Sequence, residues 1–368
     1  MESRTETGEL KRAALARVAP WARSVIVCAV NYNTAQPYSI QSEDPTRGWI
    51  SRYAWSQEDY HDAVMRRLRQ LEDRIGNELV VADSGCSSPS AASSPSGAKA
   101  RVSGPHGGTA EAVPFHRSST EPSSLETRSD HYPPATIHFF RSYVDTGPLI
   151  ERVYAKYAGI GWIGKNTCTI NQKLGSWLFL GVILTSLELT ADLPAPDRCG
   201  TCTRCLDACP THAFVAPGQL DARLCISYLT IEKRGEIPEE LRPGMGRHVF
   251  GCDICQDVCP WNRKAPVTKA PQFHPREGLV NPAVEWLAEM QENEFRSTFR
   301  ESPIHRRKLS GLRRNAVIAM GNSGDTRFVA TLMRLSEDPD PVVAEAARWA
   351  VSRLKADERD PVKLKTGN

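Results

Sequence analysis

The sequence predicts an α+β protein in three parts: an α/β-like N-terminal domain, a ferredoxin-like cysteine-rich domain and an α-helical C-terminal end. Three observations support this fold class. Strand-like apolar runs alternate with amphipathic helical segments before residue 190. Eight of the 11 cysteines lie between residues 199 and 259. Past residue 305 the apolar spacing becomes helical and repeats itself.

The N-terminal part begins with a strand and a helix. Residues 24–32 form an apolar run rich in β-branched residues, which predicts a buried strand. From Asp59 the apolar residues recur every three or four positions, so we expect an amphipathic helix that ends near Gly76. Residues 79–82 suggest a short strand. Ser, Pro, Gly and Ala then dominate residues 83–131, which we interpret as a disordered or loosely tethered insertion.

Regular structure is expected to resume at residue 136. Residues 136–144 predict a strand, followed by a turn at residues 145–148 and a helix from Leu149 to about Ala158 that Gly159 closes. Residues 177–185 predict another core strand. The first domain is therefore expected to span residues 1–190.

The cysteine spacing predicts a domain with two clusters over residues 191–265. Residues 199–210 follow the bacterial ferredoxin pattern C-x2-C-x2-C-x3-C-P, in which the fourth cysteine binds a second cluster. Residues 252–260 repeat the pattern short of one member, with Cys225 between the two runs. The predicted ligands are Cys199, Cys202, Cys205 and Cys259 for one [4Fe-4S] cluster, and Cys209, Cys225, Cys252 and Cys255 for the other.

Zinc is the alternative metal, because two all-cysteine zinc sites would use the same number of thiolates. The tight spacing favours iron-sulfur clusters, which would lie close enough to pass single electrons. The remaining cysteines, Cys28, Cys86 and Cys168, share no ligand spacing.

Composition indicates an ordinary globular protein, with 40% apolar and 24% charged residues and a net charge of +3. No apolar run approaches the roughly 18 residues that a membrane span needs, and the N-terminus lacks the apolar core of a signal peptide. Cysteines this dense then favour metal binding in a reducing compartment. We expect a cytoplasmic monomer without a membrane partner.

The C-terminal end is predicted to contain HEAT-like helical repeats over residues 305–368, after a connecting segment at 266–304. Residues 314–321 and 345–352 align, with an Asp-Pro break between them. The approach to the repeats is basic and suits phosphates, although a solvated helix face would look the same. Its basic residues are Arg296, Arg300, Arg306, Arg307, Lys308, Arg313 and Arg314.

From about residue 22 to residue 353 the sequence resembles the epoxyqueuosine reductases, cobalamin-dependent iron-sulfur enzymes of tRNA queuosine modification. The matching stretches are residues 22–26, 52–61, 144–148, 159–166, 225–230, 314–316 and both cysteine runs. The resemblance implies the last step of queuosine biosynthesis, the reduction of epoxyqueuosine to queuosine in tRNA. It also implies electrons that pass from an unidentified donor through two [4Fe-4S] clusters to cobalamin.

The resemblance places Asp145 in the active site as the proton donor to the epoxide oxygen. The departing oxygen needs a proton, which a carboxylic acid can supply when its pKa is raised. The alternative is that Asp145 only caps its own turn. The resemblance further implies the cobalamin neighbours Ser51, Asp145, Arg152, Asn166, Thr169, Leu180, Ser227 and Asp253. It also suggests the tRNA contacts Lys233, Arg306, Arg307 and Arg314.

Three hypotheses about the function remain. The first is the tRNA-modifying reductase. The others are a two-cluster electron-transfer protein and a corrinoid enzyme like the reductive dehalogenases, which are usually exported behind a twin-arginine signal that this sequence lacks. The acidic turn and the basic helical end favour the first. No histidine stands out as a cobalt ligand, and His61 fits a structural role at the start of its helix.

Overall fold

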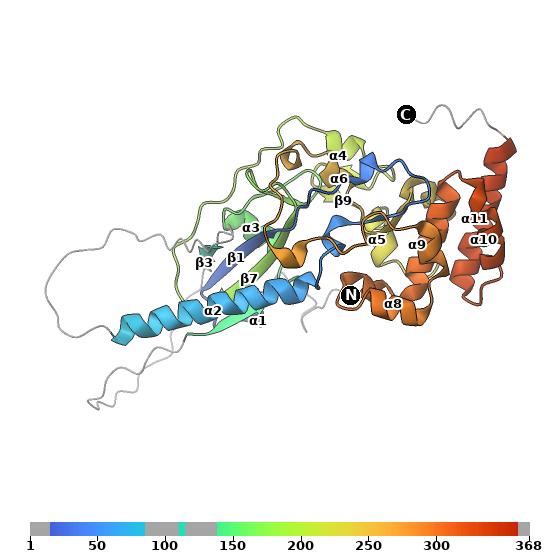
Figure 1. Cartoon of the computed structure of the whole chain (residues 1–368). Helices are drawn as coiled ribbons and strands as arrows, with labels where there is room; N and C mark the ends of the chain where they lie inside the picture. Colours follow the sequence, from blue (N-terminus) through green and yellow to red (C-terminus); the bar gives the residue numbers. More distant parts are fainter. Residues whose placement is uncertain (1–14, 85–109, 115–137, 360–368) are drawn as a thin grey trace. The chain divides into compact units, whose positions relative to one another are not determined.

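The computed structural model describes residues 15–84, 110–114 and 138–359 (Figure 1). They separate into two compact units that the chain enters more than once. The first unit contains residues 1–30, 61–162 and 178–197, and the second contains residues 31–60, 163–177 and 198–368. The domain ranges inferred from the sequence stay predictions.

A four-stranded sheet with the order β3-β1-β7-β4 forms the first unit. Its strands are β1 (Ser24–Asn31), β3 (Ala110–Pro114), β4 (Phe140–Tyr143) and β7 (Leu178–Thr185). β3 pairs antiparallel with β1, and β4 pairs antiparallel with β7. The apolar runs around β1 and β7 are buried in the centre, as their composition predicts, with Val27, Val182 and Ile183 inaccessible to solvent.

Helices α1 (Leu15–Val18), α2 (Tyr60–Ser84) and α3 (Glu151–Tyr157) accompany the sheet. α2 packs closely on β7, because a Cβ at Gly181 would lie 2.9 Å from a methyl carbon of Leu68. α3 is closed by Gly159 with a φ of 72°, as expected. Figure 1 shows α2 running as one uninterrupted helix beside the sheet.

The predicted end of α2 near Gly76 and the predicted strand at 79–82 are both wrong. The helix continues to Ser84. A glycine inside a helix costs only about 1 kcal/mol relative to alanine, whereas each further residue adds a hydrogen bond to a helix that already exists. Gly76 has nothing within 4 Å of its Cβ position, so no neighbour forces the helix to stop there.

Most of the predicted insertion at residues 83–131, including Cys86, lies outside the described residues. Asp83 and Ser84 end α2, and Ala110–Pro114 form β3. For these residues the expectation of an unstructured segment is wrong. β3 gains its structure from the backbone of β1, since five residue pairs from Ser24–Pro114 to Cys28–Ala110 are in register.

The second unit holds the cysteine runs on short elements. β2 (Trp49–Ile50) pairs in parallel with β10 (His248–Phe250). The other strands are β5 (Trp162–Ile163), β6 (Thr169–Ile170), β8 (Phe214–Ala216) and β9 (Gln219–Leu220). The short helices of the cysteine-rich segment are α4 (Arg204–Asp207), α5 (Ile226–Ile231) and α6 (Ile254–Asp257). The 3-10 helices η2 (Ser39–Gln41), η3 (Arg52–Ala54) and η6 (Pro260–Asn262) flank them.

The end of the second unit is helical, as predicted. It consists of α7 (Val284–Glu289), α8 (Glu292–Thr298), α9 (Leu309–Asn322), α10 (Val329–Leu335) and α11 (Pro341–Arg359). α9 is buried on most sides and packs on α11, where a Cβ at Gly321 would lie 2.8 Å from the Cβ of Ala350. Among the described helices, none has the length and apolar character to cross a membrane.

Candidate metal centre and active site

The eight cysteines predicted as ligands lie in the second unit and gather in two groups. Burial raises the pKa of Cys205 to about 11. Repulsion from the neighbouring thiolates of Cys259, Cys199 and Cys202 also raises it, so these four cysteines lie together. Burial also raises the pKa of Cys252, which has Cys225 and Cys209 as charged neighbours. Cys255 likewise has Cys252 and Cys225 nearby. The first group is therefore Cys199, Cys202, Cys205 and Cys259, and the second group is Cys209, Cys225, Cys252 and Cys255.

Both groups have the donor chemistry that a metal cluster requires. Thiols crowded in a buried place resist ionisation, because the thiolates repel each other and lose their hydration. A positively charged metal centre reverses this balance and binds the thiolates. In the described part of the chain, no three His, Cys, Asp or Glu side chains are arranged to hold one metal ion. That result concerns single-ion sites, since a cubane holds each thiolate on a different iron.

Cys168 lies between the two groups, a position that its spacing in the sequence did not reveal. It shares a side-chain hydrogen bond with Cys255 and is a charged neighbour of Cys225 and Cys259. Asn166 fixes the same segment: its Nδ2 donates to the carbonyl of Cys255 at 3.2 Å, and its Oδ1 accepts from the backbone of Cys168 at 3.2 Å. The segment from Asn166 to Cys168 thus lies against the cysteine loops.

Asp253, next to Cys252, lies at the centre of a buried hydrogen-bond network. The carboxylate accepts from Trp49 Nε1 at 3.1 Å, from the backbone of Arg52 at 2.7 Å and from Ser51 Oγ. Burial raises the pKa of Asp253, and these hydrogen bonds oppose the shift. Ser51 and Asp253, both predicted cobalamin neighbours, are thus bonded to each other in the interior of the second unit.

The other predicted cobalamin neighbours have different surroundings. Thr169 is buried, and its hydroxyl has no hydrogen-bond partner among the described residues. Ser227 is partly buried in the first turn of α5. In the first unit, Leu180 on β7 is partly buried and Arg152 on α3 is exposed. Because buried polar groups normally have partners, the hydroxyl of Thr169 fits a site for a water or a ligand.

Asp145 occupies the predicted turn after β4, in the first unit. Its φ is 57°, which is unusual for a residue other than glycine, and its side chain is 58% exposed. The turn is tight, since the backbone of Thr146 donates to Val144 O at 2.6 Å and a Cβ at Gly147 would meet the ring of Tyr143. The turn thus presents a carboxylate outward on a constrained backbone.

His61, in the first turn of α2, accompanies Asp145. Its Nε2 lies 3.8 Å from Asp145 Oδ2, and its side chain is 29% exposed. The sequence suggested only a structural role for this histidine. Nothing in the local pattern could have revealed the pairing, because the two residues are far apart in the chain.

The expectation of a surface role is wrong for Arg307 and Arg314, which are 3% and 1% exposed. Arg314 donates to the backbone carbonyls of Leu229, Lys233 and Gly235, and burial lowers its pKa to about 9. Burial also lowers the pKa of Arg307, to about 10, and its guanidinium fills the space beside Gly311. The positive charge of Arg314 holds a loop of carbonyl oxygens, a use that composition alone cannot distinguish from phosphate binding.

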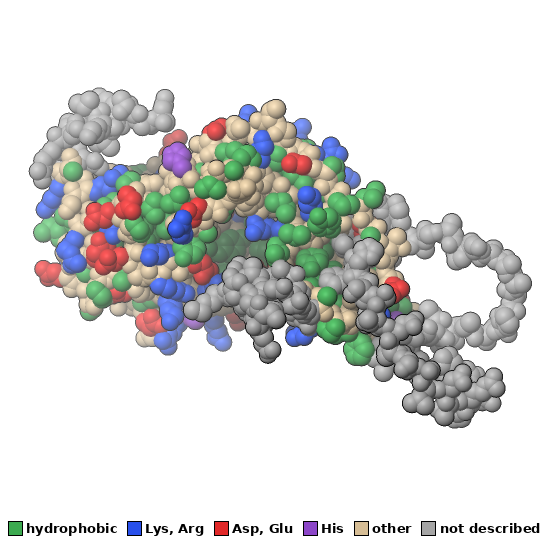
Figure 2. Space-filling view, turned by 180° about the vertical axis from the view of Figure 1, so that it is seen from behind, with side chains coloured by type: hydrophobic (Ala, Val, Ile, Leu, Met, Phe, Trp, Pro, Cys, Tyr) green, Lys and Arg blue, Asp and Glu red, His purple; other side chains and the backbone are tan. Residues whose placement is uncertain are grey.

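Other members of the predicted basic approach are neutralised. Arg296 pairs with Glu292 at 2.6 Å, Arg306 with Glu232 at 2.8 Å and Arg313 with Asp338 at 2.5 Å. Within the described residues, Arg300 and Lys308 are exposed and lie in no ion pair. Figure 2 shows basic and acidic side chains interspersed on the face that it presents. The approach is thus less positive than its sequence indicates.

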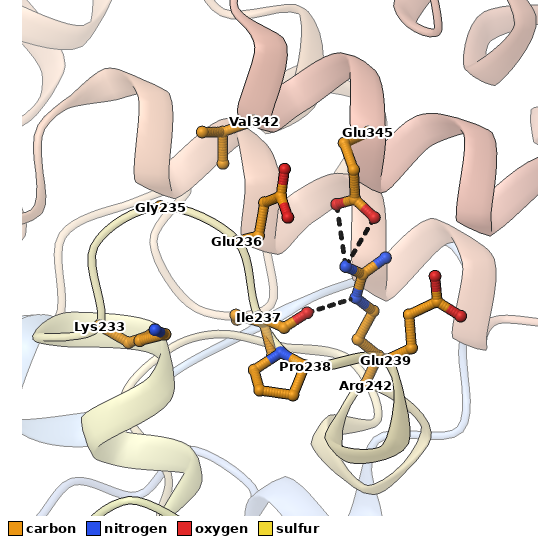
Figure 3. A pocket seen from close by; sticks show the side chains of 9 residues that line it. All are labelled: Lys233, Gly235, Glu236, Ile237, Pro238, Glu239, Arg242, Val342 and Glu345. Carbon is orange, nitrogen blue, oxygen red and sulfur yellow. Dashed lines mark hydrogen bonds and ion pairs between the residues drawn. The ribbon is translucent and has the colours of Figure 1, made fainter.

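A pocket of about 560 Å³ lies beside Lys233 in the second unit (Figure 3). Arg242 lines it and is itself 2% exposed, with its guanidinium bonded to both carboxylate oxygens of Glu345 and to Ile237 O. The ring of Trp349 lies 5.3 Å from the guanidinium carbon. These contacts tie the loop after α5 to α11, which makes the pocket wall part of the scaffold.

Comparison with known proteins gives two family matches. Residues 198–262 match the family model of the 4Fe-4S double cluster binding domain, and residues 12–86 match that of Epoxyqueuosine reductase QueG, DUF1730. An epoxyqueuosine reductase of Pseudomonas aeruginosa is 36% identical over 347 residues, which are 93% of this chain and 80% of that protein. One of Synechocystis is 39% identical over 308 residues, which are 83% and 86% of the two chains.

Solved structures agree with these matches. The crystal structure of epoxyqueuosine reductase with an epoxyqueuosine-modified tRNA-Tyr stem loop matches with a TM-score of 0.71 and 28% identity, over 96% of this chain and 80% of that one. The enzyme of Streptococcus thermophilus matches with a TM-score of 0.70 and 27% identity, over 96% and 80%.

The match over residues 198–262 confirms the iron-sulfur interpretation of the cysteines over the zinc alternative. The relatives span nearly all of the sequence, so the likeness is not confined to the cluster domain. The chain belongs to the epoxyqueuosine reductase family.

Proposed function

We propose that this protein reduces epoxyqueuosine to queuosine in tRNA, the last step of queuosine biosynthesis, with two [4Fe-4S] clusters and cobalamin as cofactors. The observation that carries the proposal is the likeness to epoxyqueuosine reductases over most of both chains. The reaction consumes two electrons and two protons, opens the epoxide to an alkene and releases water. The bound cofactors supply the electrons, and the residues of the chain must hold the clusters, deliver the protons and position the tRNA.

The first cysteine group holds one cluster and the second group holds the other. Their mutual electrostatic influence supports this division. Residues beside the first group, such as Gly200 and Thr201, are exposed, whereas Gly251 and Asp253 beside the second group are buried. With clusters bound, electrons would enter at the first group, beside the exposed Gly200 and Thr201, and would continue to the second.

Asp145 is the proton donor to the epoxide oxygen. Its exposure and its turn support this role, because a proton donor must reach a substrate and recover its proton afterwards. His61, at 3.8 Å, is placed to orient the carboxyl group and to return a proton to it. A carboxylic acid that only capped its turn would not need this neighbour.

Thr169 is one of the proposed cobalamin neighbours, and its partnerless hydroxyl supports a polar ligand group there. Ser51 and Asp253 support the site through their buried network. The further proposed neighbours are Asn166, Ser227, Leu180, Arg152 and Asp145.

The tRNA-binding surface includes Lys233 and Arg306. Arg306 is exposed, and Arg234 beside Lys233 is exposed as well. Arg234 also donates to the carbonyl of Arg307, so several basic groups gather at this loop. Helices α9 to α11 form the HEAT-like end that carries the loop, which the close packing of α9 on α11 supports. The enzyme acts as a monomer in the cytoplasm, where its tRNA substrate is modified.

One experiment tests the function. Protein reconstituted without oxygen is given dithionite and an epoxyqueuosine-containing tRNA stem loop, and the nucleosides are analysed by mass spectrometry. We expect about eight iron atoms per chain, bound corrin and conversion to queuosine. A protein with both clusters but no corrin and no conversion would instead be a two-cluster electron-transfer protein.

A variant tests the tRNA surface. Replacing Lys233 and Arg306 with Gln should weaken stem-loop binding and lower the slope of log affinity against log salt by up to about two. Arg334→Gln, an exposed arginine on α10, is the matched control. Equal affinity of the double variant and the control would assign the tRNA to another surface.

A further inference from the structure

The first cysteine group is bordered by exposed basic side chains, which we call the basic rim: Arg198, Arg204, Arg263 and Lys264. Arg198 and Arg204 directly precede the ligands Cys199 and Cys205. Arg263 and Lys264 follow Cys259 and the turn of η6. Helix α4, which begins at Arg204, packs on α6, which ends two residues before Cys259, so the two stretches lie together at one group of thiols.

The rim carries a net positive charge. None of its four side chains lies in an ion pair within the described residues. The two exposed acids near it are Asp197 and Asp207, and the carboxylate of Asp207 accepts from Thr203 Oγ1 at 2.8 Å. Lys165 adds a further positive charge, since its Nζ donates to the carbonyls of Gly200 and Cys202 at 2.7 and 3.0 Å.

The surroundings of the second group differ. Asp253 and Asp257 on its α6 segment are buried and hydrogen-bonded, and Gly251 is buried. The exposed Arg223, two residues before Cys225, is paired with Asp221, so among the described residues exposed positive charge without an ion pair is concentrated around the first group. Charge of this kind accelerates the encounter with a partner of opposite charge more than it strengthens the complex. A fast, weak and salt-sensitive encounter suits a carrier that must bind, deliver one electron and leave.

We propose that the basic rim is the docking surface for an acidic one-electron carrier protein. The proposal rests on the proposed function and names the chemistry of its electron donor. In each encounter one electron passes from the reduced centre of the carrier to the first cluster. The carrier is oxidised by one electron, the cluster is reduced by one, and no bond or proton changes place. Two such encounters supply one epoxide reduction.

The test uses the reconstituted full chain and a reduced acidic [2Fe-2S] ferredoxin as the probe. In the rim variant, Arg204 and Lys264 are replaced with Glu. In the control variant, Arg296 and Arg334, exposed arginines of α8 and α10, are replaced with Glu. Stopped-flow absorbance follows ferredoxin oxidation at low and high salt. We expect the rim variant to react at least about tenfold more slowly at low salt and to match the control at high salt.

Dithionite, which needs no protein docking, gives the second readout. The rim variant should retain its iron content and its dithionite-driven conversion. A milder variant, Arg263→Gln with Lys264→Gln, replaces it should the charge reversal prevent cluster loading. Equal ferredoxin rates for rim and control variants would overturn the proposal. So would loss of stem-loop affinity at an unchanged ferredoxin rate, since the rim would then bind RNA.

The same measurements separate this proposal from the proposed function. Salt-dependent reduction by ferredoxin in a protein that converts no epoxyqueuosine with dithionite would support the docking surface and reject the function. Conversion with dithionite, together with equal ferredoxin rates in the rim and control variants, would support the function and reject the docking surface.

Discussion

Asp145 and Asp253 are two carboxylates whose surroundings are opposite. Asp253 is 1% exposed and accepts three hydrogen bonds from Trp49, Ser51 and Arg52. Asp145 is mostly exposed, sits at a positive φ and has a histidine at 3.8 Å. A buried carboxylate that accepts three hydrogen bonds maintains a structure, whereas one that faces solvent on a strained turn can exchange a proton. The difference predicts separate consequences of mutation.

The largest expected effect is on turnover at Asp145. Asp145→Asn keeps the size of the side chain but cannot donate an acidic proton, so conversion of epoxyqueuosine should fall by about 10²–10⁴-fold. Iron content and corrin binding should stay at the wild-type level, as measured by absorption spectra. A variant that retains turnover would remove this residue from the chemistry.

Removing the buried carboxylate should affect stability instead. Asp253→Ala leaves Trp49 Nε1 and the amide of Arg52 without their acceptor, and we expect a loss of about 3 kcal/mol in the free energy of unfolding. Denaturant unfolding followed by tryptophan fluorescence measures it. The matched control is Asp221→Ala, which removes an acid paired with the exposed Arg223 and should cost far less. Equal costs would show that the network around Asp253 is not stabilising.

Low pH should lower the free energy of unfolding through the same buried region. His248 pairs with Trp49 between β10 and β2, and burial lowers its pKa from 6.5 to about 4. The unfolded chain takes up a proton near pH 6.5, whereas the folded chain resists it until about pH 4. Stability is therefore complete above pH 6.5 and declines as the pH falls, by about 2 kcal/mol at pH 5. His248→Gln should remove this part of the pH dependence in denaturant titrations.

The smallest expected effect lies at His61. His61→Asn removes the imidazole beside Asp145 but preserves the start of α2, so kcat should fall by about tenfold with KM for the stem loop unchanged. Added imidazole should restore part of the rate, because the site is partly open to solvent. A change in KM alone would assign His61 to tRNA binding.

The sequence predicted local features better than contacts between distant segments. Strands β1, β4 and β7 and the turn at Asp145 follow from apolar runs and turn residues, which act over a few neighbours. The grouping of the cysteines follows the ferredoxin spacing, because ligand exchange between clusters fixes which residues meet. The end of α2 was missed, because one glycine does not outweigh the helix on either side of it.

The other features that the sequence did not predict involve contacts between residues far apart in the chain. Arg314 looks like a surface charge until the carbonyls of Leu229, Lys233 and Gly235 surround it. Cys168 lacks ligand spacing, yet the chain returns it to a place beside Cys255. His61 and Asp145 meet only because α2 and the turn after β4 belong to the same unit. In each case the information lies in the tertiary structure and not in the neighbouring residues.

Strand β3 has a practical consequence for protein production. Its five residues occupy the side of β1 that β7 leaves open, so they shield backbone donors and acceptors that could otherwise template aggregation. Deleting the whole Ser/Pro-rich stretch to obtain a shorter protein would uncover that row of groups. Trimming on either side while retaining Ala110–Pro114 should preserve solubility.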